Sequence, residues 1–189
     1  MHRHTLTGLI AAALAATALA QTAVDERVAE ARGIVKAFGG TLKGELQAGM
    51  KAGGPVQAID VCHTRAPQIA QELSAQHGWS VARTSLKLRN PGNAPNAWET
   101  QVLNEFEARK AAGADPNTLE YSAVVDQDGR QVYRYMKAIP TGQVCLSCHG
   151  GDAVAPQVEA KLQQWYPHDQ ARGYQAGDLR GAFTLTKPL

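Results

Sequence analysis

The sequence predicts an α+β fold in which one antiparallel sheet carries helices on its surface. In the first third of the chain, apolar residues recur at steps of three and four, which is typical of amphipathic helices. Further on, two alternating segments flank Asp128-Gly129, a dipeptide typical of tight β-hairpin turns. With 189 residues and no internal repeat, the chain is long enough for one domain with a substantial core.

Residues 1–20 are predicted to be a signal peptide. Basic Arg3 precedes an apolar run over residues 9–16, and Ala18-Leu19-Ala20 has the small residues of a cleavage site. The run is short and rich in alanine, which favours cleavage over the alternative, an uncleaved anchor. We therefore expect a periplasmic protein whose single domain spans residues 21–189 and has no stable membrane span.

Two helices are predicted at the start of this domain. The first covers residues 24–46 and is expected to end at Gly49 and the Gly53-Gly54-Pro55 cluster. The second carries one apolar stripe, formed by Ile59, Cys62, Ala66, Ile69 and Leu73. Pro67 lies within this pattern and is expected to kink or restart the helix. Cys62 is expected to face the core.

The rest of the chain predicts strands with two further helices. Residues 79–84 and 86–89 alternate, which indicates one strand or two short ones. Asn96 with Glu99 predicts a capped helix start, and that helix continues to about residue 112. Its inward residues are expected to be Trp98, Val102, Leu103 and Phe106. The clearest strands are the hairpin arms 119–125 and 131–139, followed by a helix over 155–165 and a strand over 181–186.

Cys145-Leu146-Ser147-Cys148-His149 is a C-x-x-C-H motif between the hairpin and the last helix. Cysteines at this spacing can each form a thioether bond to a haem vinyl group, while the adjacent histidine binds the iron. The motif therefore predicts one covalently bound haem c. A thiol–disulfide oxidoreductase using Cys145 and Cys148, or a structural zinc site built from these residues with Cys62, are the alternatives.

Cys62 is the third cysteine of the chain and has no predicted disulfide partner. An unpaired thiol in an oxidising compartment is liable to oxidation unless it is buried or bound to metal. It is therefore expected to be buried in the core or bound to a metal. If the haem iron takes a second protein ligand, the candidates besides Cys62 are His63, His77, His168, Met50 and Met136.

Charge and composition exclude several classes of function. Removal of Arg3 with the signal peptide leaves 18 basic and 17 acidic residues, so the net charge falls from +2 to +1. No basic run suggests a nucleic-acid partner. Nothing resembles a catalytic base or nucleophile, so we expect a protein that is not an enzyme. The sequence makes no prediction of oligomeric state.

Motifs along residues 28–189 resemble those of a known family. They are Ala58-Ile59-Asp60-Val61-Cys62 with Ala66-Pro67, residues 86–93 with Trp98-Glu99, residues 145–150, Tyr166-Pro167, residues 171–174 and residues 177–182. The family is a group of monohaem c-type cytochrome domains of unknown function, with stand-alone secreted members and members that form the sensing part of receptors.

The resemblance implies a PAS-like antiparallel sheet with flanking helices that encloses the haem. It also implies that Cys62 binds the iron as a thiolate opposite His149, an arrangement that stabilises ferric iron. Haem propionates need cationic partners, and we expect Arg89 in this role, with Lys87, Lys137 and Arg180 as alternatives. The expected function is redox or small-gas sensing, or single-electron transfer, with a redox protein or a diatomic gas as partner.

Overall fold

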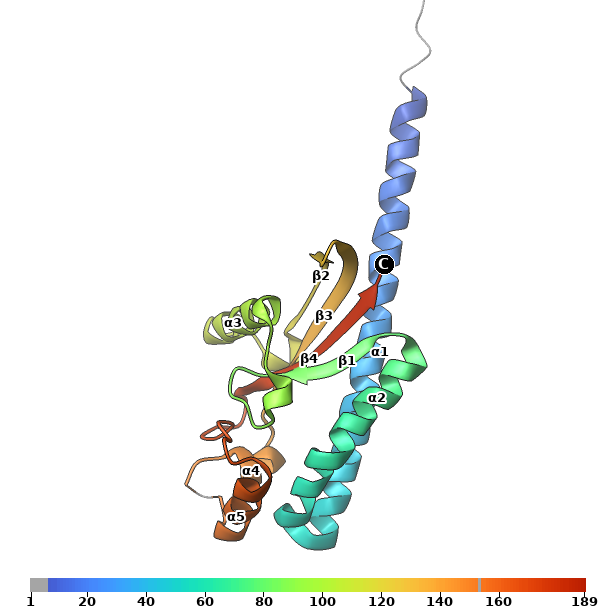
Figure 1. Ribbon diagram of the computed structural model, residues 1–189. Helices are drawn as coiled ribbons and strands as arrows, with labels where there is room; N and C mark the ends of the chain where they lie inside the picture. The colour runs from blue at the N-terminus through green and yellow to red at the C-terminus, as the bar shows by residue number, and fades with distance from the viewer. Residues whose placement is uncertain (1–6, 153) are drawn as a thin grey trace, which may run out of the picture.

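The computed structural model describes residues 7–152 and 154–189 and contains one four-stranded antiparallel sheet with helices on both faces (Figure 1). The strands are β1 (Ser80–Thr84), β2 (Glu120–Gln127), β3 (Arg130–Pro140) and β4 (Leu179–Pro188), in the order β1-β4-β3-β2. The main helices are α1 (Thr7–Asp60), α2 (Ala66–His77), α3 (Ala97–Ala111), α4 (Leu146–His149) and α5 (Pro156–Trp165). This arrangement confirms the predicted α+β class.

Helix α1 is a pair of helical arms separated by a kink. Gly53 and Gly54 leave the helical conformation there, and Gly54 has φ +68°, which glycine adopts without steric cost. Pro55 follows, and its fixed φ suits the start of the second arm. The chain reverses at this point and returns through α2 beside α1 (Figure 1). The predicted end at Gly53-Gly54-Pro55 is confirmed, whereas Gly49 lies inside the helix.

A short π-helix, η1 (Val61–Arg65), joins the second arm of α1 to α2 and carries Cys62. The predicted restart near Pro67 is confirmed, because this proline occupies the first turn of α2, where no amide donor is needed. The other members of the predicted stripe are buried, but Cys62 is only half-buried. π-helices are rare and often occur at functional sites.

The two faces of the sheet belong to separate apolar clusters. Side chains alternate along β3, so Tyr133 and Tyr135 pack with α1 and α2, while Met136 and Ala138 pack with α3. A third cluster joins the end of α1 to α5, and Cys148 packs against it. Its buried members are Ile59, Val154, Val158, Leu162 and Tyr166.

Helix α3 begins with the predicted capping box. Asn96 Oδ1 accepts from the Glu99 amide and Glu99 Oε2 accepts from the Asn96 amide, each at 3.0 Å. Glu99 Oε1 also accepts from Arg134 Nη2 at 3.0 Å and from Thr184 Oγ1 at 2.7 Å, which ties α3 to β3 and β4. Val102, Leu103 and Phe106 are buried as predicted, whereas Trp98 is half-buried and lies edge-on to Tyr121.

The predicted strand over residues 86–89 is wrong, because β1 ends at Thr84. Ser85 Oγ donates to the Lys87 and Arg180 carbonyls at 3.0 and 2.8 Å, and the chain then bends away from the sheet. Residues 86–89 instead contact the loop before β4, where the Gln170 amide donates to the Leu88 carbonyl at 2.7 Å. The hairpin is confirmed, with Asp128 and Gly129 both at positive φ. The predicted helix over 155–165 and strand over 181–186 are also found.

One end of the sheet holds the C-x-x-C-H segment. At this end β1 and β3 finish and β4 begins, with Thr84 paired to Ala182 and Pro140 paired to Leu179. The chain leaves β3 through the 3-10 turn η4 (Gln143–Cys145) directly into α4. The Thr141 amide donates to the Asp178 carbonyl at 2.7 Å, which fixes this exit to the loop before β4.

The predicted signal peptide covers residues 1–6, which lie outside the described residues, and the start of α1. In the part of the chain that the structure describes, no helix combines the length and the hydropathy needed to cross a bilayer.

We predict that Gly181→Ala destabilises the fold by about 1–3 kcal/mol, because Gly181 has φ +151° and an added Cβ would lie 2.3 Å from the Thr84 carbonyl oxygen. Urea unfolding measures the change. Gly44→Ala is the control, since Gly44 lies exposed in α1 with no heavy atom within 4 Å of an added Cβ. That variant should gain about 0.5–1 kcal/mol. Equal effects of the two substitutions would contradict the prediction.

Candidate functional site

The two cysteines of the motif lie one helical turn apart at the junction of η4 and α4. Cys145 ends η4, and Cys148 and His149 end α4, so both thiols lie on the same side of this short helical stretch. All three cysteines are free and half-buried. The pair is therefore available to react with a group that approaches this end of the sheet.

His149 is held through one ring nitrogen and presents the other. Nδ1 lies 2.9 Å from the Ala171 carbonyl oxygen, which assigns the ring proton to Nδ1. Nε2 then carries the lone pair and faces Arg89 Nη1 at 3.3 Å and Arg180 Nε at 3.4 Å. The ring of Tyr174 stands edge-on, with its centroid 6.1 Å away.

The surroundings of His149 keep its imidazole neutral. Burial lowers its pKa well below the usual value, and the charges of Arg89 and Arg180 act in the same direction. A neutral imidazole whose Nδ1–H is bound to a carbonyl is the form in which histidine binds metals through Nε2. The residues present thus fit the chemistry that the motif predicts.

Arg89 forms a buried ion pair with Asp169. Its Nη2 lies 2.9 Å from Asp169 Oδ2, and the two side chains are only 9% and 6% exposed. Nη2 also donates to the Cys148 carbonyl at 2.6 Å and to the Ala171 carbonyl at 3.3 Å. Burial acts to raise the pKa of Asp169, but the hydrogen bond and charge of Arg89 outweigh it and lower that pKa. Arg89 therefore joins the loop before β4 to the motif.

Charged groups around the motif also act on the thiol of Cys62. Burial raises the pKa of its thiol, and the charges of Arg83 and Arg89 partly offset that effect. The thiol of Cys145 is close enough to contribute as well. The structure thus brings Cys62 toward residues that follow it by more than eighty positions in the sequence.

His63 faces a different neighbour from Cys62. Its Nδ1 lies 3.0 Å from the Tyr166 hydroxyl, and its ring centroid lies 4.0 Å from that of Trp165. His63 is therefore engaged with the end of α5. Of the remaining ligand candidates, Met136 is buried in the α3 cluster and His168 is exposed, while His77 and Met50 are half-buried on α2 and α1.

The candidate propionate partners divide by position. Arg89 and Arg180 lie at His149, and Lys87 lies beside them with its Nζ 5.1 Å from the centroid of the Tyr174 ring. Lys137 is instead paired with Glu120 on the hairpin, at 3.9 Å.

Sequence reasoning missed three residues of this site. The sequence does mark Arg83, because it follows Trp79 and Val81 on the inward side of an alternating segment, where a charged residue is unusual. Asp169 and Ala171 had none, since they lie in an irregular loop and reach the motif only through tertiary contacts.

Among the described residues, no group of three or more His, Cys, Asp or Glu side chains is arranged to hold a metal ion. The alternative zinc site from Cys62, Cys145, Cys148 and His149 therefore has no preformed cluster in this fold.

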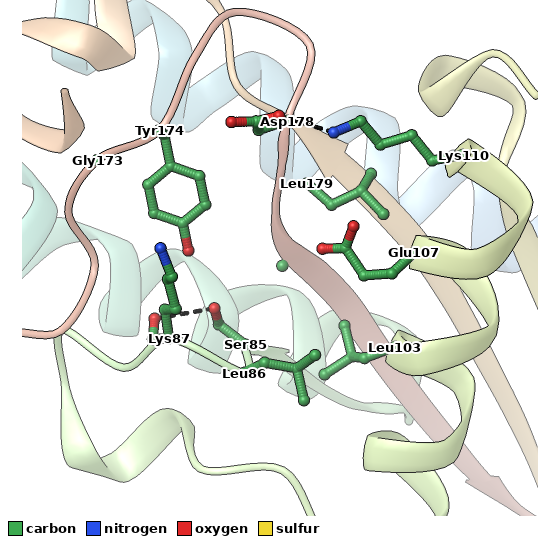
Figure 2. Close-up of a pocket in the computed structure, with 11 residues that line it drawn as sticks. Ser85, Leu86, Lys87, Leu103, Glu107, Lys110, Gly173, Tyr174, Asp178 and Leu179 are labelled. Carbon is green, nitrogen blue, oxygen red and sulfur yellow. Dashed lines mark hydrogen bonds and ion pairs between the residues drawn. The ribbon is translucent and has the colours of Figure 1, made fainter. Parts of the chain in front are cut away.

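A cavity of about 230 Å³ lies between α3 and the loop that carries Tyr174 (Figure 2). Tyr174 and Lys87 lie on one side of it, and Glu107 and Lys110 of α3 lie on the other. Lys110 Nζ pairs with Asp178 at 2.7 Å. Tyr174 therefore lines the cavity and also lies edge-on to the ring of His149.

A sequence model of the Tll0287-like family matches residues 9–188, a range that includes Cys62 and the whole motif. Among solved structures, the cyanobacterial heme-protein Tll0287 is similar to this fold, with a TM-score of 0.67 and 26% sequence identity. That match covers 86% of this chain and 95% of the other. No curated protein matches the chain significantly.

We predict that Asp169→Asn costs about 3 kcal/mol of stability at neutral pH, because it leaves the buried Arg89 cation without its anion. The pKa of Asp169 is lowered on folding, so its contribution is complete above the ordinary value of about 3.9 and is lost at lower pH. Urea unfolding should therefore show a constant deficit from about pH 8 to pH 5 that narrows below about pH 4.

Asp152, an exposed aspartate, provides the control for this prediction. Asp152→Asn should change stability by no more than about 0.5 kcal/mol. A deficit of the same size in both variants would show that the Arg89–Asp169 pair has no special role.

Proposed function

This chain belongs to the Tll0287-like family, and on that premise we propose that it is a haem-binding cytochrome with one haem c attached to Cys145 and Cys148. The observation that carries the proposal is the C-x-x-C-H motif with His149 held at Nδ1 by Ala171 and presenting Nε2. The similar cyanobacterial protein is described as a heme-protein, which supports it.

In this proposal His149 and Cys62 are the two axial ligands. Support for Cys62 comes from its position near Cys145. Burial raises the pKa of its thiol, so the thiolate would form on binding to the iron, which deprotonates a coordinating thiol. His63 is the rival, but its imidazole contacts Tyr166 and Trp165. The bound haem would supply one-electron chemistry, and a thiolate ligand would favour its ferric state.

The biological role we propose is redox or small-gas sensing, or single-electron transfer, in the periplasm. With His149 and Cys62 both engaged, the protein leaves no open coordination position for a substrate. That arrangement favours electron exchange with a redox protein, or displacement of one of these ligands by a diatomic gas, over enzymatic turnover.

Production of the full chain in a bacterium with c-type maturation should yield a red protein whose haem survives acid-acetone extraction. Cys145→Ala combined with Cys148→Ala should abolish this covalent attachment. Cys62→Ala is the matched control, and it should keep the attachment while changing the ligand field. A colourless wild-type protein would refute the proposed function and favour the alternative, a thiol–disulfide oxidoreductase that uses Cys145 and Cys148.

Cys62→Ser should remove the thiolate features from the ferric optical and EPR spectra, because serine is a poor donor to ferric iron. His63→Gln should leave these features in place. If instead the His63 variant loses them and the Cys62 variant does not, the second ligand is His63.

A further inference from the structure

Two half-buried guanidinium groups, those of Arg83 and Arg180, have no carboxylate partner among the residues that the structure describes. Arg89 is paired with Asp169 at 2.9 Å and Arg134 with Glu99 at 3.0 Å. By contrast, Arg83 and Arg180 form no ion pair with any residue that the structure describes, although burial lowers the pKa of both. A buried charge is costly unless an opposite charge compensates it.

The two unpaired cations lie at the same end of the sheet. Arg83 is near the end of β1, with its guanidinium carbon 5.6 Å from the centroid of the Phe38 ring. Arg180 is near the start of β4, where Nη1 donates to Ser85 Oγ at 3.0 Å and Nε lies 3.4 Å from His149 Nε2. Strand pairing brings these positions together, because Thr84 is opposite Ala182.

The positive charge of Arg83 acts on Arg180 across this end of the sheet. The positive charges of Arg89 and Arg83 both contribute to the lowered pKa of Arg180. The charge of Arg83 in turn acts on the thiol of Cys62. Arg180 therefore lies at His149, and Arg83 acts on Cys62, the two residues proposed to hold the iron. Neither arginine has an anionic partner among the described residues.

We propose that Arg83 and Arg180 bind the two propionate carboxylates of the haem. The inference rests on the proposed function and assigns the residues that receive the acidic edge of the cofactor. Guanidinium groups bind carboxylates through paired N–H donors, and two of them match the two carboxylates of one haem. Each propionate would supply the anion that Arg83 or Arg180 lacks within the fold.

This assignment gives Arg89 a different task from the one the sequence suggested. Its Nε already donates to Asp169, and its Nη2 donates to the Cys148 and Ala171 carbonyls. Its charge is compensated by Asp169. Arg89 thus positions the loop that holds His149, and Arg83 and Arg180 remain to neutralise the propionates.

The test uses the haem-loaded full chain with Arg83→Gln, Arg180→Gln and the double variant. Resonance Raman spectroscopy reports the propionate bending band, whose frequency falls when a propionate loses hydrogen-bond donors. We expect a lower frequency in each single variant and a larger change in the double variant. The midpoint potential should also fall, because the loss of a nearby cation favours ferric iron.

Two further variants separate propionate binding from a general effect of charge. Arg83→Lys keeps the cation but loses the planar fork, so it should shift the propionate band while retaining most of the midpoint potential. Arg27→Gln is the control, because Arg27 also lies 5.6 Å from an aromatic ring centroid, that of Tyr133. It should leave both readouts at the wild-type values.

A haem-loaded double variant with the wild-type propionate band would overturn this inference and leave the proposed function intact. A fall in midpoint potential without a band shift would also overturn it, since it would show only a distant charge effect. If a glutamine variant takes up no haem, the Arg83→Lys and Arg180→Lys variants test the inference instead, through the frequency of the same propionate band. A wild-type protein that takes up no haem would instead refute the proposed function.

Discussion

The buried ion pair between Arg89 and Asp169 joins three segments that are distant in the sequence. Arg89 follows β1, Asp169 follows α5, and the same guanidinium donates to the carbonyl of Cys148 in α4. Asp169 Oδ1 in turn accepts from the amide of Ala171, whose carbonyl holds His149 Nδ1 at 2.9 Å. The orientation of the imidazole therefore depends on this charge pair, whose Arg89 also lies 3.3 Å from the other ring nitrogen, Nε2.

The position of this cluster follows from the architecture of the sheet. β1 and β3 end and β4 begins at one end of the sheet. The segments after β1 and β3 carry Arg89 and the motif, and Arg180 lies at the start of β4. The kink in α1 and the π-helix η1 after it bring Cys62, which lies in the N-terminal third of the chain, to the same region. A local helix irregularity and a long-range strand pairing thus converge on one site.

Features encoded by neighbouring residues were predictable from the sequence, and those that depend on distant residues were not. The Asp128-Gly129 hairpin, the Asn96–Glu99 capping box and the helix end at Gly53-Gly54-Pro55 are local, and the structure confirms them. The family match confirms the resemblance that the motifs indicated. Residues 86–89 alternate like a strand, but their contacts with the loop before β4 decide their conformation, and no local pattern encodes that loop.

The placement of the motif also has a consequence for the order of assembly. Cys145, Cys148 and His149 are contiguous in the chain, whereas Cys62, Arg89 and Asp169 reach them only through contacts of long sequence separation. Such contacts carry a larger loop-closure entropy and form later in folding than local ones. The motif thiols are thus present and accessible in the partly folded chain before the Arg89–Asp169 ion pair forms.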